Sequence, residues 1–161
     1  MIGLSDGGVK YVSFILRVLE TLDQEIASLE IARTAAERQT NNTFKNAMRA
    51  TDIPRIAEWW FVILTSPLLQ SNPEVVASCL KVMTVFAVWI EIRIIANEKF
   101  IDKLFELVVN NGSPSAFYSP AACECLAAIL HKGMEAKFKL ELLQHCRVEE
   151  NFEKYFDAKM F

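Results

Sequence analysis

Cys123 and Cys125, two cysteines with one residue between them, are the first place where metal or redox chemistry could occur. They fall in an apolar run that we expect to be helical, where residues two apart point roughly 200° away from each other. One metal ion therefore cannot be held locally by both thiolates. Neither His131 nor His145 has a second histidine or a cysteine three or four residues away. We predict that the four cysteines of the chain are buried free thiols.

Motifs for catalysis are missing from the sequence. It has no glycine-rich phosphate loop, no nucleophile elbow, no paired carboxylates with an adjacent base and no metalloprotease signature. We predict that the chain is not an enzyme and uses no cofactor. Its formal net charge of −3 also excludes a strongly basic nucleic-acid-binding module, although a local basic face remains possible.

Basic residues between positions 33 and 55 form the one charge feature that suggests a ligand. Five basic and two acidic residues give this segment a net charge of +3. Lys45 and Arg49 are four apart and share one face of a predicted helix, and Arg38 precedes Lys45 by seven residues. Such a face can neutralise the phosphates of a nucleic acid. A solvated helix face is the alternative interpretation.

Adjacent tryptophans, Trp59 and Trp60, suggest base stacking at first sight. On a helix the two rings point about 100° apart, so at most one is exposed while the other lies in the core. We predict that this pair, and Trp89 in the most apolar run, serve packing.

The elements that position these residues are predicted to be helices. The chain has 161 residues, of which 52% are hydrophobic, and only 5 Gly and 5 Pro, too few for the turns of an all-β fold. From 9 to 31, apolar residues recur at steps of three and four and form one stripe. The stripe is Val12, Ile15, Leu19, Leu22, Ile26 and Leu29. No apolar stretch approaches the roughly 20 residues that cross a bilayer, so we predict no membrane insertion.

Helix starts are marked by capping residues and prolines. Thr34 and Glu37 form a capping-box pattern, Pro54 and Pro73 suit a first helical turn, and Asn97 suits an N-cap. Asn111-Gly112 suits a left-handed C-terminal cap. These signals predict helices near 9–31, 34–50, 54–68, 73–90, 98–110, 120–132, 135–146 and 148–158.

The helix starts repeat. From Pro54 to Asn97 is 43 residues and from Asn97 to Glu135 is 38, each with two helices between. A helical-hairpin period near 40 is typical of HEAT and armadillo solenoids. We predict an all-α, α-α superhelix of about three antiparallel helix pairs, with a closed helical bundle as the alternative. Residues 1–161 are expected to be a single segment of a larger solenoid, because the last residues do not look like a terminal cap.

Residues 89–101 read W-I-E-I-R-I-I-A-N-E-K-F-I, and this stretch resembles the W-I-D-x-x-L-I-x-N-[DE]-x-F-I of the exportin-T (tRNA exportin) family in the importin-β/karyopherin superfamily. Glu91 stands where the family usually has Asp. Further segments fit in the same order. They are Lys45-x-x-Met48-Arg49 before Ile53-Pro54, then Glu58-Trp59, then Ala121 to Leu126 with Lys132-Gly133-Met134. The resemblance covers roughly residues 8 to 145.

This resemblance implies a segment from the N-terminal half of a nuclear export receptor, about three HEAT repeats long. Such a receptor carries tRNA in a Ran-GTP-dependent complex, by shape and phosphate recognition, and shuttles between nucleus and cytoplasm. Nucleoporins are further expected partners. The implied RNA contacts are Lys45 and Arg49, where the motif matches, followed by Arg38 and Arg55 by proximity.

A HEAT-repeat scaffold for protein–protein assembly, or a karyopherin for protein cargo, is the alternative and has no RNA role. Acidic residues such as Glu20, Asp23 and Glu25 could face a basic protein on that interpretation.

Overall fold

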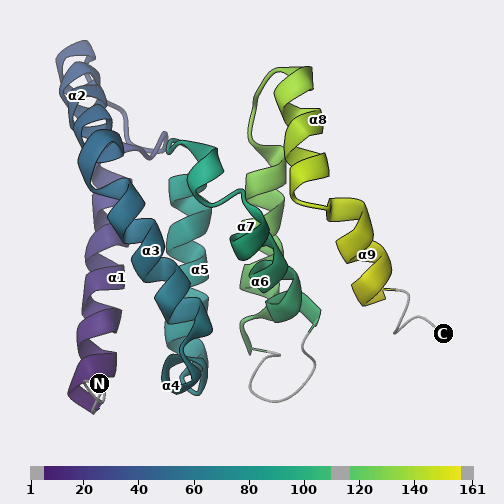
Figure 1. The fold of residues 1–161 in the computed structure, drawn as a ribbon. Coiled ribbons are helices and arrows are strands. Elements are labelled where there is room, and N and C mark those ends of the chain that lie inside the picture. The colour runs from purple at the N-terminus through teal and green to yellow at the C-terminus, as the bar shows by residue number, and fades with distance from the viewer. Residues whose placement is uncertain (1–5, 110–116, 157–161) are drawn as a thin grey trace.

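The computed structural model describes residues 6–109 and 117–156, and these residues form helices and no strands (Figure 1). The helices are α1 (Asp6–Ile26), α2 (Ala35–Thr51), α3 (Ile53–Thr65), α4 (Pro67–Gln70), α5 (Pro73–Ala87), a short 3-10 turn η1 (Ile92–Ile94), α6 (Glu98–Val109), α7 (Ser119–His131), α8 (Ala136–His145) and α9 (Val148–Phe156). The predicted helices are therefore all present. The predicted cap at Asn111-Gly112 lies outside the described residues.

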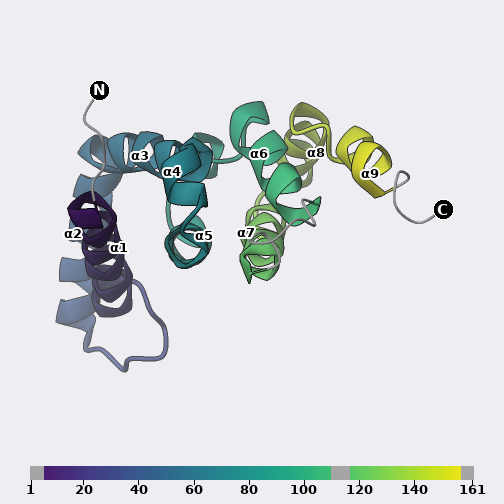
Figure 2. The same cartoon turned by 90° about the horizontal axis from the view of Figure 1, so that it is seen from below.

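The helices form two layers. Figure 2 shows α1, α5 and α7 side by side in one layer and α3, α6, α8 and α9 in the other. In Figure 1, α1, α5 and α7 run in the same direction, from bottom to top. The closest packing joins α5 to α7, α6 to α7 and α1 to α5. Antiparallel pairs stacked in one direction are an all-α, HEAT-like solenoid, as predicted from the repeat period.

The core lies between the two layers and is centred on α5. This helix buries residues on several sides, among them Val76, Leu80, Met83 and Phe86. The ring of Phe86 meets Trp60 of α3 edge-on, with centroids 5.5 Å apart. The helix that begins at Pro73 is therefore covered on more than one face.

The first helix ends at Ile26 and not near residue 31 as predicted. Leu29, expected on the buried stripe, is 97% exposed. The physical reason is Arg33, whose guanidinium donates hydrogen bonds to the carbonyls of Gln24 and Glu25 at 2.8 and 2.7 Å and closes the helix end. The buried stripe of α1 also differs in detail, since it includes Leu16 while Ile15 is only half-buried.

Two other helices are shorter than predicted. The one beginning near Pro54 stops at Thr65, because Pro67 lacks a backbone N–H and disfavours a helical residue before it. The short helix α4 follows. The helix beginning at Pro73 stops at Ala87, and the chain then turns through Trp89.

Three of the four free cysteines are buried, namely Cys79, Cys125 and Cys146. Burial raises the pKa of Cys125 to about 12 and that of Cys146 to about 11. Cys123 is exposed, so the prediction of burial is wrong for this residue. The cause is its position two residues before Cys125, which turns it to the opposite side of α7.

Residues 6–109 and 117–156 contain no group of three His, Cys, Asp or Glu side chains placed to hold a metal ion. None of the helices in these ranges combines the length and apolar character needed to cross a lipid bilayer.

Candidate nucleic-acid interface

Helix α2 carries most of the basic segment and is held at its start by the predicted capping box. The backbone N–H of Thr34 donates to Glu37 Oε2 at 2.7 Å, and the N–H of Glu37 donates to Thr34 Oγ1 at 3.2 Å. The Glu37 carboxylate accepts from the Thr34 N–H and, at 2.8 Å, from the Thr34 hydroxyl, and these two bonds lower the pKa of Glu37. Met48 is the buried residue of α2, and all the others are exposed or half-buried.

A basic hollow of about 310 Å³ lies between α2 and the loop after α1, and we call it the α2 hollow. Arg38 and Lys45 both line it, as their spacing of seven residues suggests. No acidic residue is among the described residues that line it. The lining residues are Ile26, Ala27, Ser28, Leu29, Ile31, Ala32, Arg33, Arg38, Asn41, Asn42 and Lys45. Amide and cationic donors without a carboxylate suit an anionic group such as a phosphate.

The cations around the α2 hollow are not equally available. Arg33 is occupied by the carbonyls at the end of α1. Arg38 donates one hydrogen bond, from Nη1 to the Arg33 carbonyl at 2.8 Å, and a guanidinium has five N–H donors. Lys45 lies close enough to Asp23 for its charge to lower the pKa of that carboxyl. Arg38 and Lys45 are thus the cations of the hollow with donors left for a ligand.

Arg49 does not line the α2 hollow. Its Nε donates to the Trp89 carbonyl at 2.7 Å, Nη2 donates to the same oxygen, and Nη1 donates to Asn46 Oδ1 at 2.7 Å. The guanidinium carbon also lies 5.7 Å from the centroid of the Trp89 ring. Arg49 therefore joins α2 to the turn after α5.

Trp89 is packed as predicted, and its indole N–H donates to a buried acidic side chain. Nε1 donates to Asp23 Oδ1 at 2.8 Å, and both side chains are buried. Asp23 is therefore not a residue that faces a basic protein, and that suggestion is wrong for it. Burial raises the pKa of Asp23, although the Trp89 hydrogen bond and the charge of Lys45 oppose the shift. Glu20 forms an ion pair of 2.6 Å with Lys81.

Lys132, at the end of α7, holds the same turn from the other side. Its Nζ donates to the carbonyls of Ala87, Val88 and Ile90 at 2.8, 2.6 and 3.2 Å. Burial, then the nearby charge of Arg49, lowers the pKa of Lys132. Residues from the predicted motifs around Arg49, Trp89 and Lys132 thus meet at one point, which spacing alone did not reveal.

The C-terminal ends of the three parallel helices are all neutralised by cations. Arg33 binds the end of α1, Arg49 and Lys132 bind the end of α5, and Lys139 binds the carbonyls of Leu130 and, at 2.7 Å, Lys132 after α7. A helix C-terminus carries partial negative charge, so each contact is favourable. These ends lie along one edge of the solenoid, at the top of Figure 1, and we call it the cation-capped edge.

Arg55 lies on a different surface from the α2 hollow. It lines a shallow hollow of about 350 Å³ with Met48, Asp52, Ile56 and Trp59. Trp59 is half-buried, whereas Trp60 is fully buried and its Nε1 has no hydrogen-bond partner. The prediction that at most one of the two tryptophans is exposed is confirmed.

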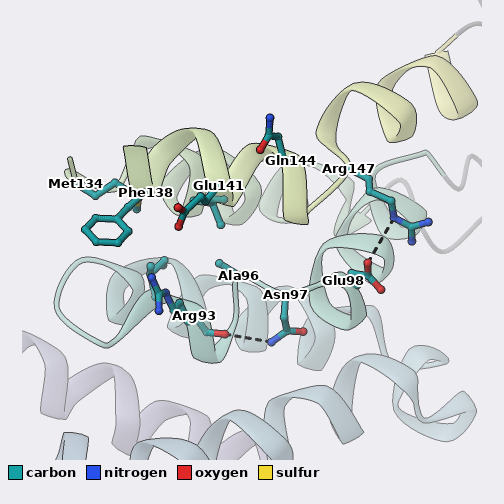
Figure 3. Close-up of a pocket in the computed structure, with 11 residues that line it drawn as sticks. Arg93, Ala96, Asn97, Glu98, Met134, Phe138, Glu141, Gln144 and Arg147 are labelled. Atoms are coloured by element: carbon teal, nitrogen blue, oxygen red, sulfur yellow. Dashed lines mark hydrogen bonds and ion pairs between the residues drawn. The ribbon is translucent and has the colours of Figure 1, made fainter. Parts of the chain in front are cut away.

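A groove lies between η1, the start of α6, and α8 (Figure 3). Its volume is about 780 Å³. Arg93 lies over the Phe138 ring, 5.6 Å from its centroid, and Arg147 pairs with Glu98 at 3.9 Å. Glu141 also lines the groove. These carboxylates make it less suited to a phosphate than the α2 hollow.

Comparison with known proteins places the chain in a family. The model of the exportin 1-like protein family matches residues 1–126. The chain belongs to the exportin 1-like family. It is 36% identical to exportin-T of Arabidopsis thaliana over 152 residues, which is 94% of this chain and 15% of that protein. It is 32% identical to human exportin-T over 139 residues, 85% of this chain and 14% of that protein.

More distant relatives carry the same name. Exportin-T of Dictyostelium discoideum is 27% identical over 142 residues, which is 88% of this chain and 12% of that protein. The resemblance to the exportin-T family is therefore confirmed. The chain spans about 15% of the length of the relatives it matches.

Proposed function

We propose that this exportin-family chain is a segment of a nuclear export receptor that carries tRNA in a Ran-GTP-dependent complex. The observation that carries the proposal is the match to proteins named exportin-T over 94% of the chain. The short span relative to those proteins supports one segment of a longer arch that shuttles between nucleus and cytoplasm and meets nucleoporins on the way.

The proposed mechanism is recognition without catalysis. A folded RNA is recognised mainly by its shape and by contacts to phosphates and 2′-hydroxyls, which suits basic side chains along a rigid helical array. The helices supply the rigidity, and the α2 hollow supplies the charge.

Within the segment, the proposed phosphate contacts are Arg38 and Lys45. Both line the α2 hollow, and none of the described residues that line this hollow carries a carboxylate. Arg49 contributes by fixing α2 to Trp89, since its donors are already engaged there. Arg55 remains a proposed contact on a separate surface beside Trp59.

A filter-binding titration of mature tRNA, with and without GTP-loaded Ran, tests the proposal in the full-length protein that carries this segment. We expect binding that requires GTP-loaded Ran. Changing Arg38→Ala and Lys45→Ala together should weaken it and lower the slope of log K against log salt by about 1.5, because two phosphate contacts are lost. The 161-residue chain alone is expected to bind tRNA weakly.

A matched control removes the same charge elsewhere. Arg17→Ala with Lys154→Ala changes exposed cations on α1 and α9 and should leave the salt slope unchanged. Equal losses in both double variants would contradict a role for the α2 hollow. RNA-independent capture of a protein partner would favour the scaffold alternative, and submicromolar tRNA binding by the 161 residues alone would contradict the expected weak binding.

A further inference from the structure

The loop of residues 27–34 joins α1 to α2 and forms an apolar wall of the α2 hollow. Leu29 is 97% exposed and Ile31 is 45% exposed, and both line the hollow together with exposed Ala32. The loop lies at the end of the array remote from α9 (Figure 2). In a solenoid each repeat contacts only its neighbours, so a repeat stacked on α8 and α9 would leave this wall uncovered.

Hydrogen bonds on both sides of Leu29 hold the wall in place. Arg33 Nη1 donates to the carbonyls of Ser28 and, at 3.3 Å, Ile31. Arg38 Nη1 donates to the Arg33 carbonyl at 2.8 Å and so ties the loop to α2. A ligand at this wall therefore loses little affinity to ordering the loop.

The opposite wall of the hollow is polar and belongs to α2. Arg38, Asn42 and Lys45 follow one another at steps of four and three residues, and all three line the hollow. Asn42 is exposed, and its side-chain amide forms no hydrogen bond within the described part of the chain. An amide both donates and accepts, which suits the polar edge of a nucleobase. The two walls together offer cations for a phosphate, an amide for a base edge and apolar side chains for a base face.

An unpaired nucleotide uses all of these groups, whereas a phosphate of a duplex uses only the cations. In an RNA duplex the bases are stacked inside, and the surface consists of phosphates, 2′-hydroxyls and base edges. Leu29 would gain nothing there. An unpaired base exposes its apolar face, which Leu29 can cover. The volume of the hollow, about 310 Å³, is at the lower end of the range for small-molecule sites and suits a single nucleotide.

We propose that the α2 hollow binds one RNA nucleotide whose base is unpaired, with the phosphate against Arg38 and Lys45 and the base against Leu29. The inference rests on the proposed function and adds that the hollow distinguishes unpaired from paired RNA. The two halves of the contact differ in their response to salt. The phosphate contact weakens with added salt, whereas the base contact releases no counterions and does not.

Amide chemical shifts of the 161-residue chain, followed by NMR, test the proposal with three probes at one salt concentration. The probes are adenosine 5′-monophosphate, ribose 5-phosphate, which has the same phosphate without the base, and inorganic phosphate. We expect all three to shift the amides of residues 38–45. The nucleotide should bind about threefold to tenfold more tightly than ribose 5-phosphate, because Leu29 covers the base. Leu29→Ser should remove this preference and leave the affinity for inorganic phosphate unchanged.

Two RNA probes separate unpaired from paired bases. The trinucleotide ApApA should shift the amides of Leu29 and of residues 38–45. A blunt-ended RNA duplex should shift those of residues 38–45 and leave that of Leu29 in place. Val62→Ser is the control, since it removes an exposed apolar side chain from α3, and it should keep the preference for the nucleotide.

Equal affinities for the nucleotide and ribose 5-phosphate, or a preference that survives Leu29→Ser, would overturn the inference and leave the proposed phosphate contacts standing. Unshifted amides at residues 38–45 with every phosphate probe would overturn the inference and those contacts together. Tighter binding of the acidic tripeptide Asp-Leu-Asp than of the nucleotide would also overturn it, because the hollow would then suit a protein partner.

Discussion

Trp89 is the residue on which distant parts of the chain converge. Its indole N–H reaches Asp23 of α1, its carbonyl accepts from Arg49 of α2, and the carbonyls on either side of it accept from Lys132 after α7. A residue held in this way fixes the positions of α1, α2 and α7 relative to α5. The motif W-I-E at this point therefore has a structural reason that does not depend on any ligand.

Asp23 is predicted to make stability depend on pH. Its pKa is raised above the ordinary 3.8, so the folded protein holds this proton more tightly than the unfolded chain does. The resulting stabilisation is complete below the ordinary pKa and is lost as pH rises through the raised one. Asp23→Asn stays neutral and still accepts the Trp89 N–H. We expect it to flatten this pH dependence and to be at least as stable at pH 7, as measured by urea unfolding with tryptophan fluorescence.

Asp23→Leu provides the matching comparison, because it leaves the buried Trp89 N–H without an acceptor. The expected cost is about 1–3 kcal/mol in the free energy of unfolding. If Asp23→Asn proved as destabilising as Asp23→Leu, the role given to burial of the charge would be wrong.

Arg49 and Lys132 are predicted to stabilise the end of α5 jointly. Replacing either by Gln should lower the free energy of unfolding by about 1–2 kcal/mol, since charged hydrogen bonds to helix-end carbonyls are lost. Each charge also repels the other, and each single change relieves that repulsion. The double variant should therefore cost more than the sum of the singles in a double-mutant cycle. Arg55→Gln is the control and should change stability by less than about 0.5 kcal/mol.

At the scale of the elements, helix starts were predictable and some helix ends were not. The starts depend on local signals, as at the Thr34–Glu37 box and at Asn97, whose Oδ1 accepts from the Phe100 N–H at 3.2 Å. The end of α5 depends on Lys132, whose carbonyl partners lie more than 40 residues earlier in the chain. No local window of sequence contains such a contact. This explains why the expected helix near 73–90 was too long.

The candidate site was predictable to a similar degree. The spacing of seven residues between Arg38 and Lys45 correctly placed them on one side of α2. The spacing of four between Lys45 and Arg49 gave the right helix face, but it could not show that the Trp89 carbonyl takes the Arg49 guanidinium. Which cations of a basic segment stay available is thus decided by tertiary contacts.

The turn between α8 and α9 is predicted to favour glycine. Arg147 has a φ of 46°, a left-handed conformation that costs an ordinary residue energy. Its side chain pairs with Asp102 at 3.2 Å and with Glu98 at 3.9 Å, both in exposed positions, so these pairs contribute little. Arg147→Ala keeps the backbone strain and loses the two ion pairs. Arg147→Gly loses the ion pairs and relieves the strain as well. We expect the Gly variant to be the more stable of the two by about 1 kcal/mol in thermal unfolding. An Ala variant more stable than the Gly variant would contradict the claim that the backbone at residue 147 is strained.

For the whole molecule, the solenoid predicts a gradient of local stability. Helices α5 and α7 are packed in the middle of the array, while among the described helices α8 packs mainly on α9. Regions with few buried contacts open first. Amide hydrogen exchange should therefore be at least about a hundredfold slower in α5 than in α8 and α9. Uniform protection along the chain would instead indicate one cooperative unit.

Parallel alignment of α1, α5 and α7 has an electrostatic consequence for any longer array of this design. Each further helix aligned with these three would bring roughly half a negative charge to the edge where their C-termini lie. Without a lysine or arginine of its own, every such helix would make that edge more repellent to a polyanion. A longer solenoid can therefore hold a nucleic acid at this edge only if each added repeat supplies a basic residue for its own helix C-terminus.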